Sequence, residues 1–146
     1  MSQLAADGRR LPVVSASLWL EGASFDPTVV TDRVGIEPTI SYRVGDSASL
    51  GRTRRRDAWG VRVGPRETLA LESLIYELIE RLAPHAERIR ETCIDLSLEP
   101  CLSCPVELKS TLMPSIHLLP ATLSWIEMLG AHLDIDVMIW DDEDDA

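Results

Sequence analysis

One continuous apolar stripe near the middle of the chain constrains the fold most. Six aliphatic residues recur there at the spacing of one helix face: Leu71, Leu74, Ile75, Leu78, Ile79 and Leu82. We expect Gly64-Pro65 to open this helix and Pro84 to end it. A helix that is apolar on one side only must bury that side against a second layer, so a layered fold is predicted.

Two shorter helices are expected on either side of this one. Asp26 followed by Pro27 is a typical helix start and Gly35 a typical helix end, which predicts a helix over about 27–34. Pro120 and Gly130 bracket the other predicted helix.

Alternating apolar residues predict strands at 14–20, 40–44, 59–63, 94–98 and 133–139. Residues 46–57 are expected to form an exposed loop, and residues 106–119 an extended stretch that is interrupted near Pro114. Strands joined by both helices and short turns, in the rough order β-α-β-β-α-β-β-α-β, indicate an α+β fold with a mainly antiparallel sheet and helices packed on one face.

The chain has 146 residues and is expected to hold one domain over 13–140, between a flexible segment 1–12 and an acidic tail 141–146. Its net charge is −10, from 14 Lys and Arg against 24 Asp and Glu. A negative chain favours a basic protein partner over nucleic acid or an anionic membrane. The sequence has no long apolar run and no secretory signal, so we expect no membrane span and a cytoplasmic location.

Three cysteines, Cys93, Cys101 and Cys104, are present in a chain without an export signal, which favours free thiols or a metal over disulfides. We expect Cys101 and Cys104 to lie in a turn between Pro100 and Pro105, as free thiols with no cofactor. The alternative is a structural zinc site in which Cys93 and a histidine complete the ligand set.

A zinc-deaminase pattern is a second alternative, because His85-Ala86-Glu87 precedes Cys101 and Cys104. Such enzymes hold zinc on one histidine and two cysteines, and a glutamate transfers protons. The predicted strand takes up about half of residues 88–99, which leaves too little chain for the helix that this chemistry needs between the two halves.

Two groups of polar and aromatic residues are candidates for partner binding. His132, Asp134 and Asp136 alternate along the last strand and share one face, with the two carboxylates about 6.6 Å apart, which suits neither a shared metal nor a coupled acid pair. The loop arginines Arg52, Arg54, Arg55 and Arg56 with Trp59 beyond them could bind a nucleic-acid backbone, but we expect a solvated loop or a protein contact instead.

Several short motifs carry a family resemblance: Phe25-Asp26-Pro27, Gly35-Ile36-Glu37-Pro38-Thr39, Tyr42-Arg43-Val44-Gly45-Asp46, Trp59 and Leu129-Gly130-Ala131-His132-Leu133-Asp134-Ile135-Asp136. In their order and spacing the chain resembles a bacterial family catalogued as domain of unknown function 4279, over roughly residues 13–140. The resemblance implies a small α+β cytoplasmic module with no established activity.

We therefore expect a non-catalytic protein-binding module, for example an immunity-like or antitoxin-like protein, with contacts at Arg43, Trp59, His132, Asp134 and Asp136. A zinc-dependent deaminase-like hydrolase, with Cys101, Cys104, His85 and Glu87, and a small-ligand sensor are the alternatives. Self-association to a homodimer through a sheet edge stays open.

Overall fold

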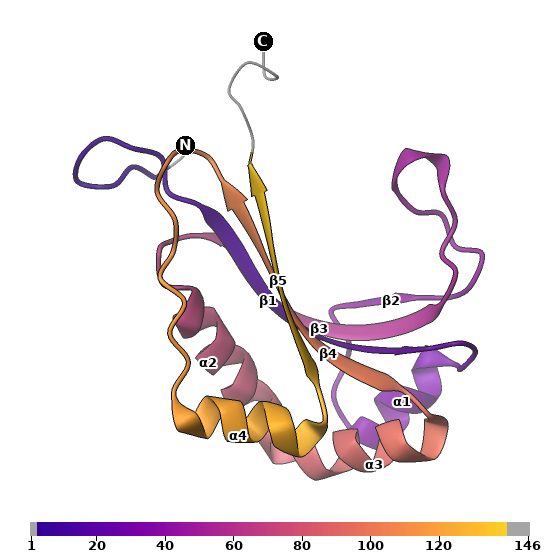
Figure 1. The fold of residues 1–146 in the computed structure, drawn as a ribbon. Helices are drawn as coiled ribbons and strands as arrows, with labels where there is room; N and C mark the ends of the chain where they lie inside the picture. The colour runs from indigo at the N-terminus through magenta and orange to yellow at the C-terminus, as the bar shows by residue number, and fades with distance from the viewer. Residues whose placement is uncertain (1–2, 140–146) are drawn as a thin grey trace.

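The structure of the chain, a computed structural model, describes residues 3–139 (Figure 1). Its elements follow in chain order: β1 (Val13–Gly22), α1 (Pro27–Val34), β2 (Ile40–Tyr42), β3 (Asp57–Glu67), α2 (Leu71–Leu82), α3 (Ala86–Leu96), β4 (Glu99–Leu108), α4 (Pro120–Leu129) and β5 (His132–Ile139). Short 3-10 turns lie at Ser49–Gly51 and Ala83–His85. The predicted acidic tail, 141–146, lies outside the described residues.

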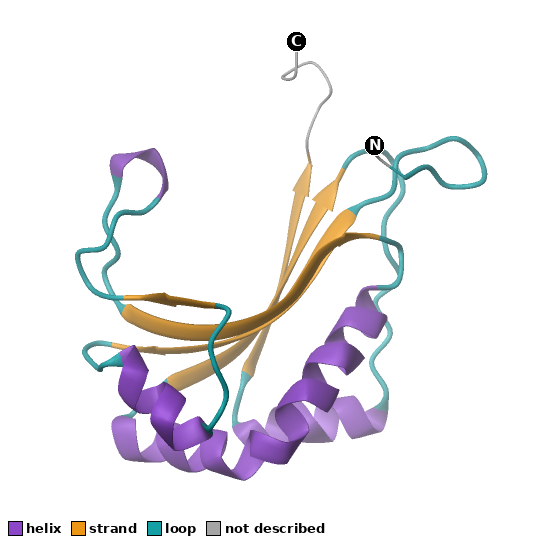
Figure 2. Cartoon of the chain, turned by 180° about the vertical axis from the view of Figure 1, so that it is seen from behind, coloured by secondary structure: helices purple, strands orange, loops and turns teal. Residues whose placement is uncertain are grey.

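The five strands form one sheet in the order β2-β3-β1-β4-β5. Every pair of neighbours is antiparallel except β4 and β5, which run parallel because α4 connects them. The helices lie together on one side of the curved sheet, as Figure 2 shows. The predicted α+β class, with helices on one face of a mainly antiparallel sheet, is confirmed.

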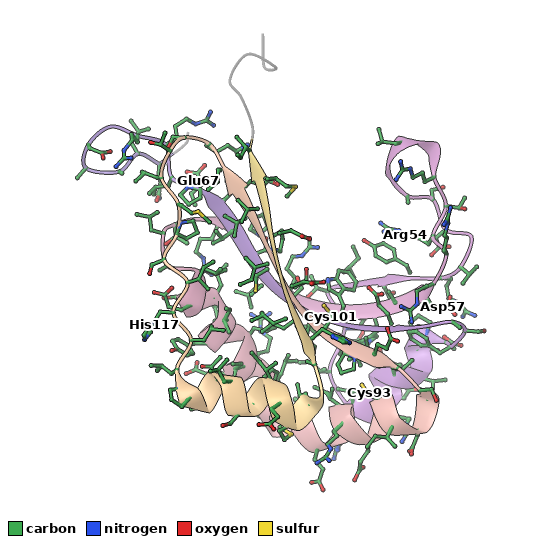
Figure 3. All side chains as sticks on the ribbon, viewed as in Figure 1. Arg54, Asp57, Glu67, Cys93, Cys101 and His117 are labelled. Carbon is green, nitrogen blue, oxygen red and sulfur yellow. The ribbon has the colours of Figure 1, made fainter. Side chains whose placement is uncertain are left out.

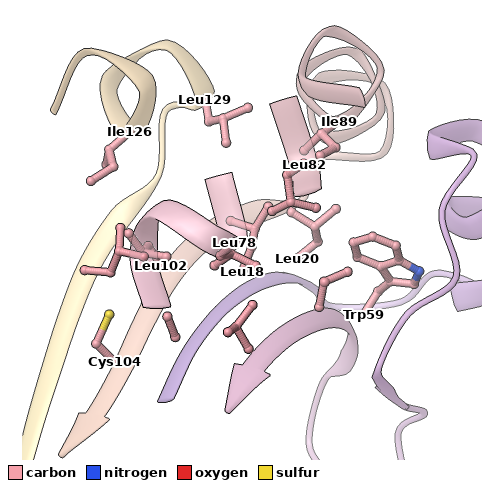
Figure 4. Packing of buried hydrophobic residues seen from close by; sticks show 14 of the residues in the cluster. Leu18, Leu20, Trp59, Leu78, Leu82, Ile89, Leu102, Cys104, Ile126 and Leu129 are labelled. Carbon is pink, nitrogen blue, oxygen red and sulfur yellow. The ribbon is translucent and has the colours of Figure 1, made fainter. Parts of the chain in front are cut away.

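The core fills the space between the sheet and the helices (Figure 4). Leu18 and Leu20 of β1 meet Leu78 and Leu82 of α2, and all four side chains are fully buried. Five of the six stripe residues that predicted α2 are buried, and Ile79 packs against the core from its margin. The stripe therefore does what its spacing predicts, although α2 begins at Leu71 rather than at Gly64-Pro65.

The two helices with clear end signals are confirmed. The Asp26 side chain accepts a hydrogen bond from the Thr28 N–H at the start of α1, and Gly35 ends the helix with φ +81°. Gly130 likewise ends α4 in the left-handed region, with φ +66°. These positions are where glycine fits best, because other residues pay a steric cost there.

The predicted strand at 94–98 is wrong, because residues 86–96 form helix α3. Ala86, Ile89, Thr92 and Cys93 are buried at helical spacing, whereas the Ile94 side chain is 67% exposed. Pro84 therefore marks a 3-10 turn between two helices and does not lead to a strand.

Two further expectations are corrected. Gly64-Pro65 lies inside β3, which runs on to Glu67 because Val13 and Val14 of β1 pair with Glu67 and Arg66. The cysteine pair lies in β4 and not in a turn, since β1 supplies pairing partners along almost the whole of this strand. Residues 109–119 connect β4 to α4 without a strand.

Candidate functional site

The candidate site lies on the side of the sheet opposite the helices, which we call the open face. Strand register places polar and aromatic residues in rows across it. One row joins Gly60 of β3, Trp19 of β1, Cys101 of β4 and His132 of β5. Trp19 and Cys101 face away from the core because they alternate with buried residues of β1 and β4, and His132 shares their face because it pairs with Cys101.

An aromatic stack stands at one end of this row. The rings of Trp19 and Tyr42 lie nearly parallel, 12° apart, with centroids separated by 5.7 Å. The guanidinium carbon of Arg54 lies 3.6 Å from the centre of the Tyr42 ring, a cation–π contact. Gly60 makes room for the stack, because a Cβ atom there would come within 2.6 Å of the Trp19 ring.

Beside the stack lies a hollow of about 450 Å³ that we call the arginine hollow. It is lined by Trp19, Glu21, Tyr42, Arg54, Arg55, Arg56, Ala58 and Arg62. Arg54 lies on the side of the sheet that is away from the helices (Figure 3). The hollow therefore combines an aromatic surface with four guanidinium groups in a chain whose net charge is −10.

Two of these arginines have partners on the open face. Arg56 forms ion pairs with Glu21 at 3.6 Å and Glu99 at 3.2 Å. Arg62 donates a hydrogen bond from Nε to the Ser17 hydroxyl oxygen at 3.2 Å. The carboxylates of Glu21 and Glu99 thus offset Arg56, whereas a neutral hydroxyl leaves the charge of Arg62 unbalanced.

The other half of the open face is acidic. His132, Asp134 and Asp136 of β5 form the acidic strip, and a smaller hollow of about 290 Å³ lies between this strip and Glu21, Glu99 and Cys101. The Cys101 thiol lies 3.6 Å from a carboxylate oxygen of Asp134. Burial, and secondarily the charge of Asp134, raises the pKa of Cys101 to about 11, so this thiol is protonated near neutral pH.

The five residues expected to contact a partner do not form one surface. His132, Asp134 and Asp136 share the open face, as their spacing predicts. Trp59 does not, because it is fully buried among the core residues and donates its indole N–H to the Thr31 hydroxyl oxygen at 3.0 Å. Contrary to the expectation from sequence, its side chain offers no surface to a partner.

Arg43 lies outside the arginine hollow and takes part in a structural cluster. Its guanidinium lies 3.4 Å from the Asp26 carboxylate and 3.9 Å from that of Asp57. The buried Asp57 carboxylate accepts hydrogen bonds from the backbone N–H groups of Phe25 and Val44, both at 2.7 Å. These two bonds lower the pKa of Asp57 below its ordinary value, and they tie the start of α1 to the end of β2.

The predicted zinc residues are not brought together. Cys101 faces the open side of β4, and Cys104 lies buried on the core side, because positions three apart in a strand point to opposite faces. His85 lies at the turn before α3, with Nδ1 3.0 Å from the Val34 carbonyl oxygen, and Glu87 is exposed on α3. Within residues 3–139, no three or more His, Cys, Asp and Glu residues are grouped closely enough to hold a metal ion. The prediction that residues 88–99 leave too little chain for a helix was wrong, because α3 is present there. The two cysteines are kept apart by the geometry of β4, which turns them to opposite faces of the sheet.

The loop arginines Arg54, Arg55 and Arg56 were candidates for partner binding from the sequence, but their place beside Trp19, Tyr42 and Arg62 was not predicted. Trp19 alternates with the apolar residues of its strand, which puts it on the opposite face, but nothing in the linear order pairs it with Tyr42. The sheet order brings them close, because β3 lies between β1 and β2 and contributes only Gly60 and Ala58 beneath the two rings.

Comparison with known proteins identifies the domain. A family model described as "Domain of unknown function (DUF4279)" matches residues 12–140, a range that contains every helix and strand named above. Neither the curated proteins nor the solved structures gave a match. In residues 3–139, no helix has both the length and the apolar composition of a membrane span.

Proposed function

This chain belongs to the DUF4279 family, and from the geometry of its open face we propose that it is a non-catalytic binding module that recognises a protein partner there. The observation that carries the proposal is the pairing of a preformed aromatic and arginine stack with an acidic strip on one uncovered sheet face. Interfaces are enriched in tryptophan, tyrosine and arginine, and their hot spots are surrounded by polar groups.

The charges of the open face define the chemistry of the partner. Net charge alone favours a basic partner, but the two signs are separated across this face. A complementary protein surface is acidic where it meets Arg54 and Arg62 and basic where it meets Asp134 and Asp136. Such a bipolar pattern fixes the orientation of one partner, and it disfavours nucleic acid because a phosphate backbone that crosses the face would meet the acidic strip.

The chemistry of Cys101 supports a role without catalysis. A cysteine beside a histidine and a carboxylate could serve as a nucleophile only as the thiolate. With a pKa of about 11, the Cys101 thiol remains protonated near neutral pH and acts at most as a weak donor to Asp134. A module of this kind acts by occupying its partner's surface, as immunity-like and antitoxin-like proteins in the cytoplasm do.

Site-specific photo-crosslinking tests the proposal. A crosslinking amino acid replaces either Ser103, at the centre of the open face, or Glu80, which is exposed on α2. We expect a stoichiometric protein adduct in native cells from position 103, absent from position 80 and absent again when Asp134→Lys reverses the acidic strip. Adducts that form equally from position 80, or from position 80 alone, would show that the partner binds elsewhere.

A further inference from the structure

We infer that the arginine hollow binds an acidic segment of the partner, with the partner's carboxylates held by Arg54, Arg55 and Arg62. This inference rests on the proposed function, because it names the part of the protein partner that the open face recognises.

Three arginines of the hollow carry charge that no carboxylate of the described residues balances. Although the chain has 24 acidic residues, no described carboxylate forms an ion pair with Arg54, Arg55 or Arg62. Arg56, which has two such partners, shows that intramolecular pairing is available on this face. Three guanidinium groups around one hollow repel one another unless an anion lies between them.

Arg54 is held in place before any ligand binds. Its backbone N–H donates to the Asp46 carbonyl oxygen at 2.8 Å, and its carbonyl oxygen accepts from the Gly45 N–H at 2.9 Å. Its guanidinium rests on the Tyr42 ring. The side chain therefore loses little conformational freedom when it binds an anion, which favours affinity.

Arg54 also carries an unsatisfied hydrogen-bond donor. The Nε atom of Arg54 is buried and has no hydrogen-bond partner within the described residues. Buried polar groups in proteins are almost always paired, and a carboxylate accepts two parallel hydrogen bonds from one edge of a guanidinium. The Nη groups of Arg54, which are not covered in this way, could donate such a pair of bonds to a carboxylate at the hollow, whereas the covered Nε would be reached only after a movement of the side chain.

The surroundings favour carboxylates of a peptide over a chain of phosphates. Glu21 lines the same hollow, and Glu99, Asp134 and Asp136 continue the face beyond it. A polyphosphate chain carries more charge per length and would meet these carboxylates, whereas an extended peptide can place acidic side chains on one side only. The exposed parts of Trp19 and Tyr42 favour an aromatic residue next to those acids.

An NMR titration of the full chain tests this inference. The probe is a nine-residue peptide with glutamate at positions 1, 3, 7 and 9, phenylalanine at position 5 and serine between them, so that the acids and the ring share one side of the extended chain. The matched control replaces each glutamate of the peptide with glutamine. We expect the glutamate peptide to shift the Trp19 indole and Arg54 Nε–H signals while the indole signals of Trp59 and Trp125 stay in place. Equal binding of the glutamine peptide, or shifts confined to Trp125, would overturn the inference.

Matched variants show which arginines contribute to binding of the glutamate peptide. Arg54→Gln and Arg62→Gln should each weaken binding of the glutamate peptide by about tenfold, as expected for loss of a charge-assisted hydrogen bond. Arg81→Gln makes the same charge change on exposed α2 and should leave the affinity unchanged. An unchanged affinity in Arg54→Gln would contradict the inference, as would stronger binding of inorganic phosphate than of the peptide at the same signals.

The two proposals fail separately. A protein adduct through position 103 without binding of the acidic peptide would support the proposed function and contradict the inference that the hollow binds an acidic segment. Peptide binding at Arg54 with adducts only through position 80 would support an anion site at the hollow and contradict a protein interface on the open face.

Discussion

Asp57, a buried residue of β3, joins two loops, one before α1 and one after β2. Its carboxylate accepts one backbone N–H from Phe25 and one from Val44. In Asp57→Asn, only one side-chain oxygen remains, and the amide NH₂ faces a backbone donor. We expect the melting temperature at neutral pH to fall by several degrees, measured by circular dichroism, because a buried N–H is left unpaired.

The pH dependence of this difference follows from the lowered pKa of Asp57. A carboxyl group whose pKa is lower in the folded state stabilises the fold fully above its ordinary value of 3.8. That stabilisation is lost as the pH falls through the lower, folded value. The difference in melting temperature between the wild type and Asp57→Asn should therefore be constant from pH 5 upward and become smaller in acid. At neutral pH the matched control Asp136→Asn, which changes an exposed carboxylate, should leave the melting temperature unchanged.

Gly60 is the second residue whose role can be measured. Its φ is not in the left-handed region, so an alanine would be tolerated by the backbone, but the new Cβ would collide with the Trp19 ring. We expect Gly60→Ala to lower the free energy of unfolding by about 2 kcal/mol, the usual scale for overpacking. Urea denaturation measures this change.

A double-mutant cycle separates the collision from any backbone effect. In a Trp19→Leu background the ring is absent, so Gly60→Ala should cost much less than it does in the wild type. Equal costs in both backgrounds would mean that Trp19 does not rest on Gly60.

On the scale of elements, helix α3 ends on an unusual residue. Ser97 adopts the left-handed conformation, with φ +55° and ψ +47°, at the turn from α3 into β4. A side chain in this region costs about 1–2 kcal/mol, and glycine avoids that cost while gaining entropy in the unfolded chain. We expect Ser97→Gly to raise the free energy of unfolding by about 0.5 kcal/mol, and β-branched Ser97→Val to lower it, in urea titrations. A stability loss in Ser97→Gly would show that the serine side chain itself stabilises this turn.

The same turn explains which elements could be predicted from the sequence. Helices α1 and α4 begin with proline and end with glycine, so local chemistry marks both ends. Helix α3 has neither signal, and Ile94 and Leu96 imitate strand alternation while its true buried face is mixed in polarity. The long pairing of β4 with β1, which keeps Cys101 and Cys104 in one strand, joins residues that are 78 to 94 positions apart in the sequence.

The shared face of candidate residues could be predicted from the sequence only where those residues lie on a single strand. His132, Asp134 and Asp136 lie on β5, and period-two spacing is enough to place them on one face. The arginine hollow needs residues from β1, β2, β3 and the loop before β3, whose adjacency is a property of the sheet order. Trp59 failed as a contact residue because the register of β3 turns it toward the core.

For the whole molecule, the distribution of charge matters more than its sum. The net charge is −10, and residues 141–146, outside the described part, supply five of the carboxylates. The arginine hollow is a positive region within a negative field, so an acidic ligand is attracted locally and repelled at long range. Salt screens the long-range repulsion between exposed charges more than it weakens a partly buried contact.

Deletion of residues 141–146 tests this balance. The truncated chain keeps residues 3–139 and has a net charge of −5, so its melting temperature should match that of the full chain. Its affinity for the glutamate peptide should rise by about twofold to threefold at low ionic strength, because five repelling charges are gone.

Ionic strength supplies the control for the deletion. At about 0.5 M salt the screening length is only a few ångströms, so the full and truncated chains should bind the peptide equally well. An affinity that falls after the deletion would instead assign part of the binding to residues 141–146. A gain that persists at high salt would mean that these residues compete directly for the arginine hollow, since a direct contact resists screening better than long-range repulsion does.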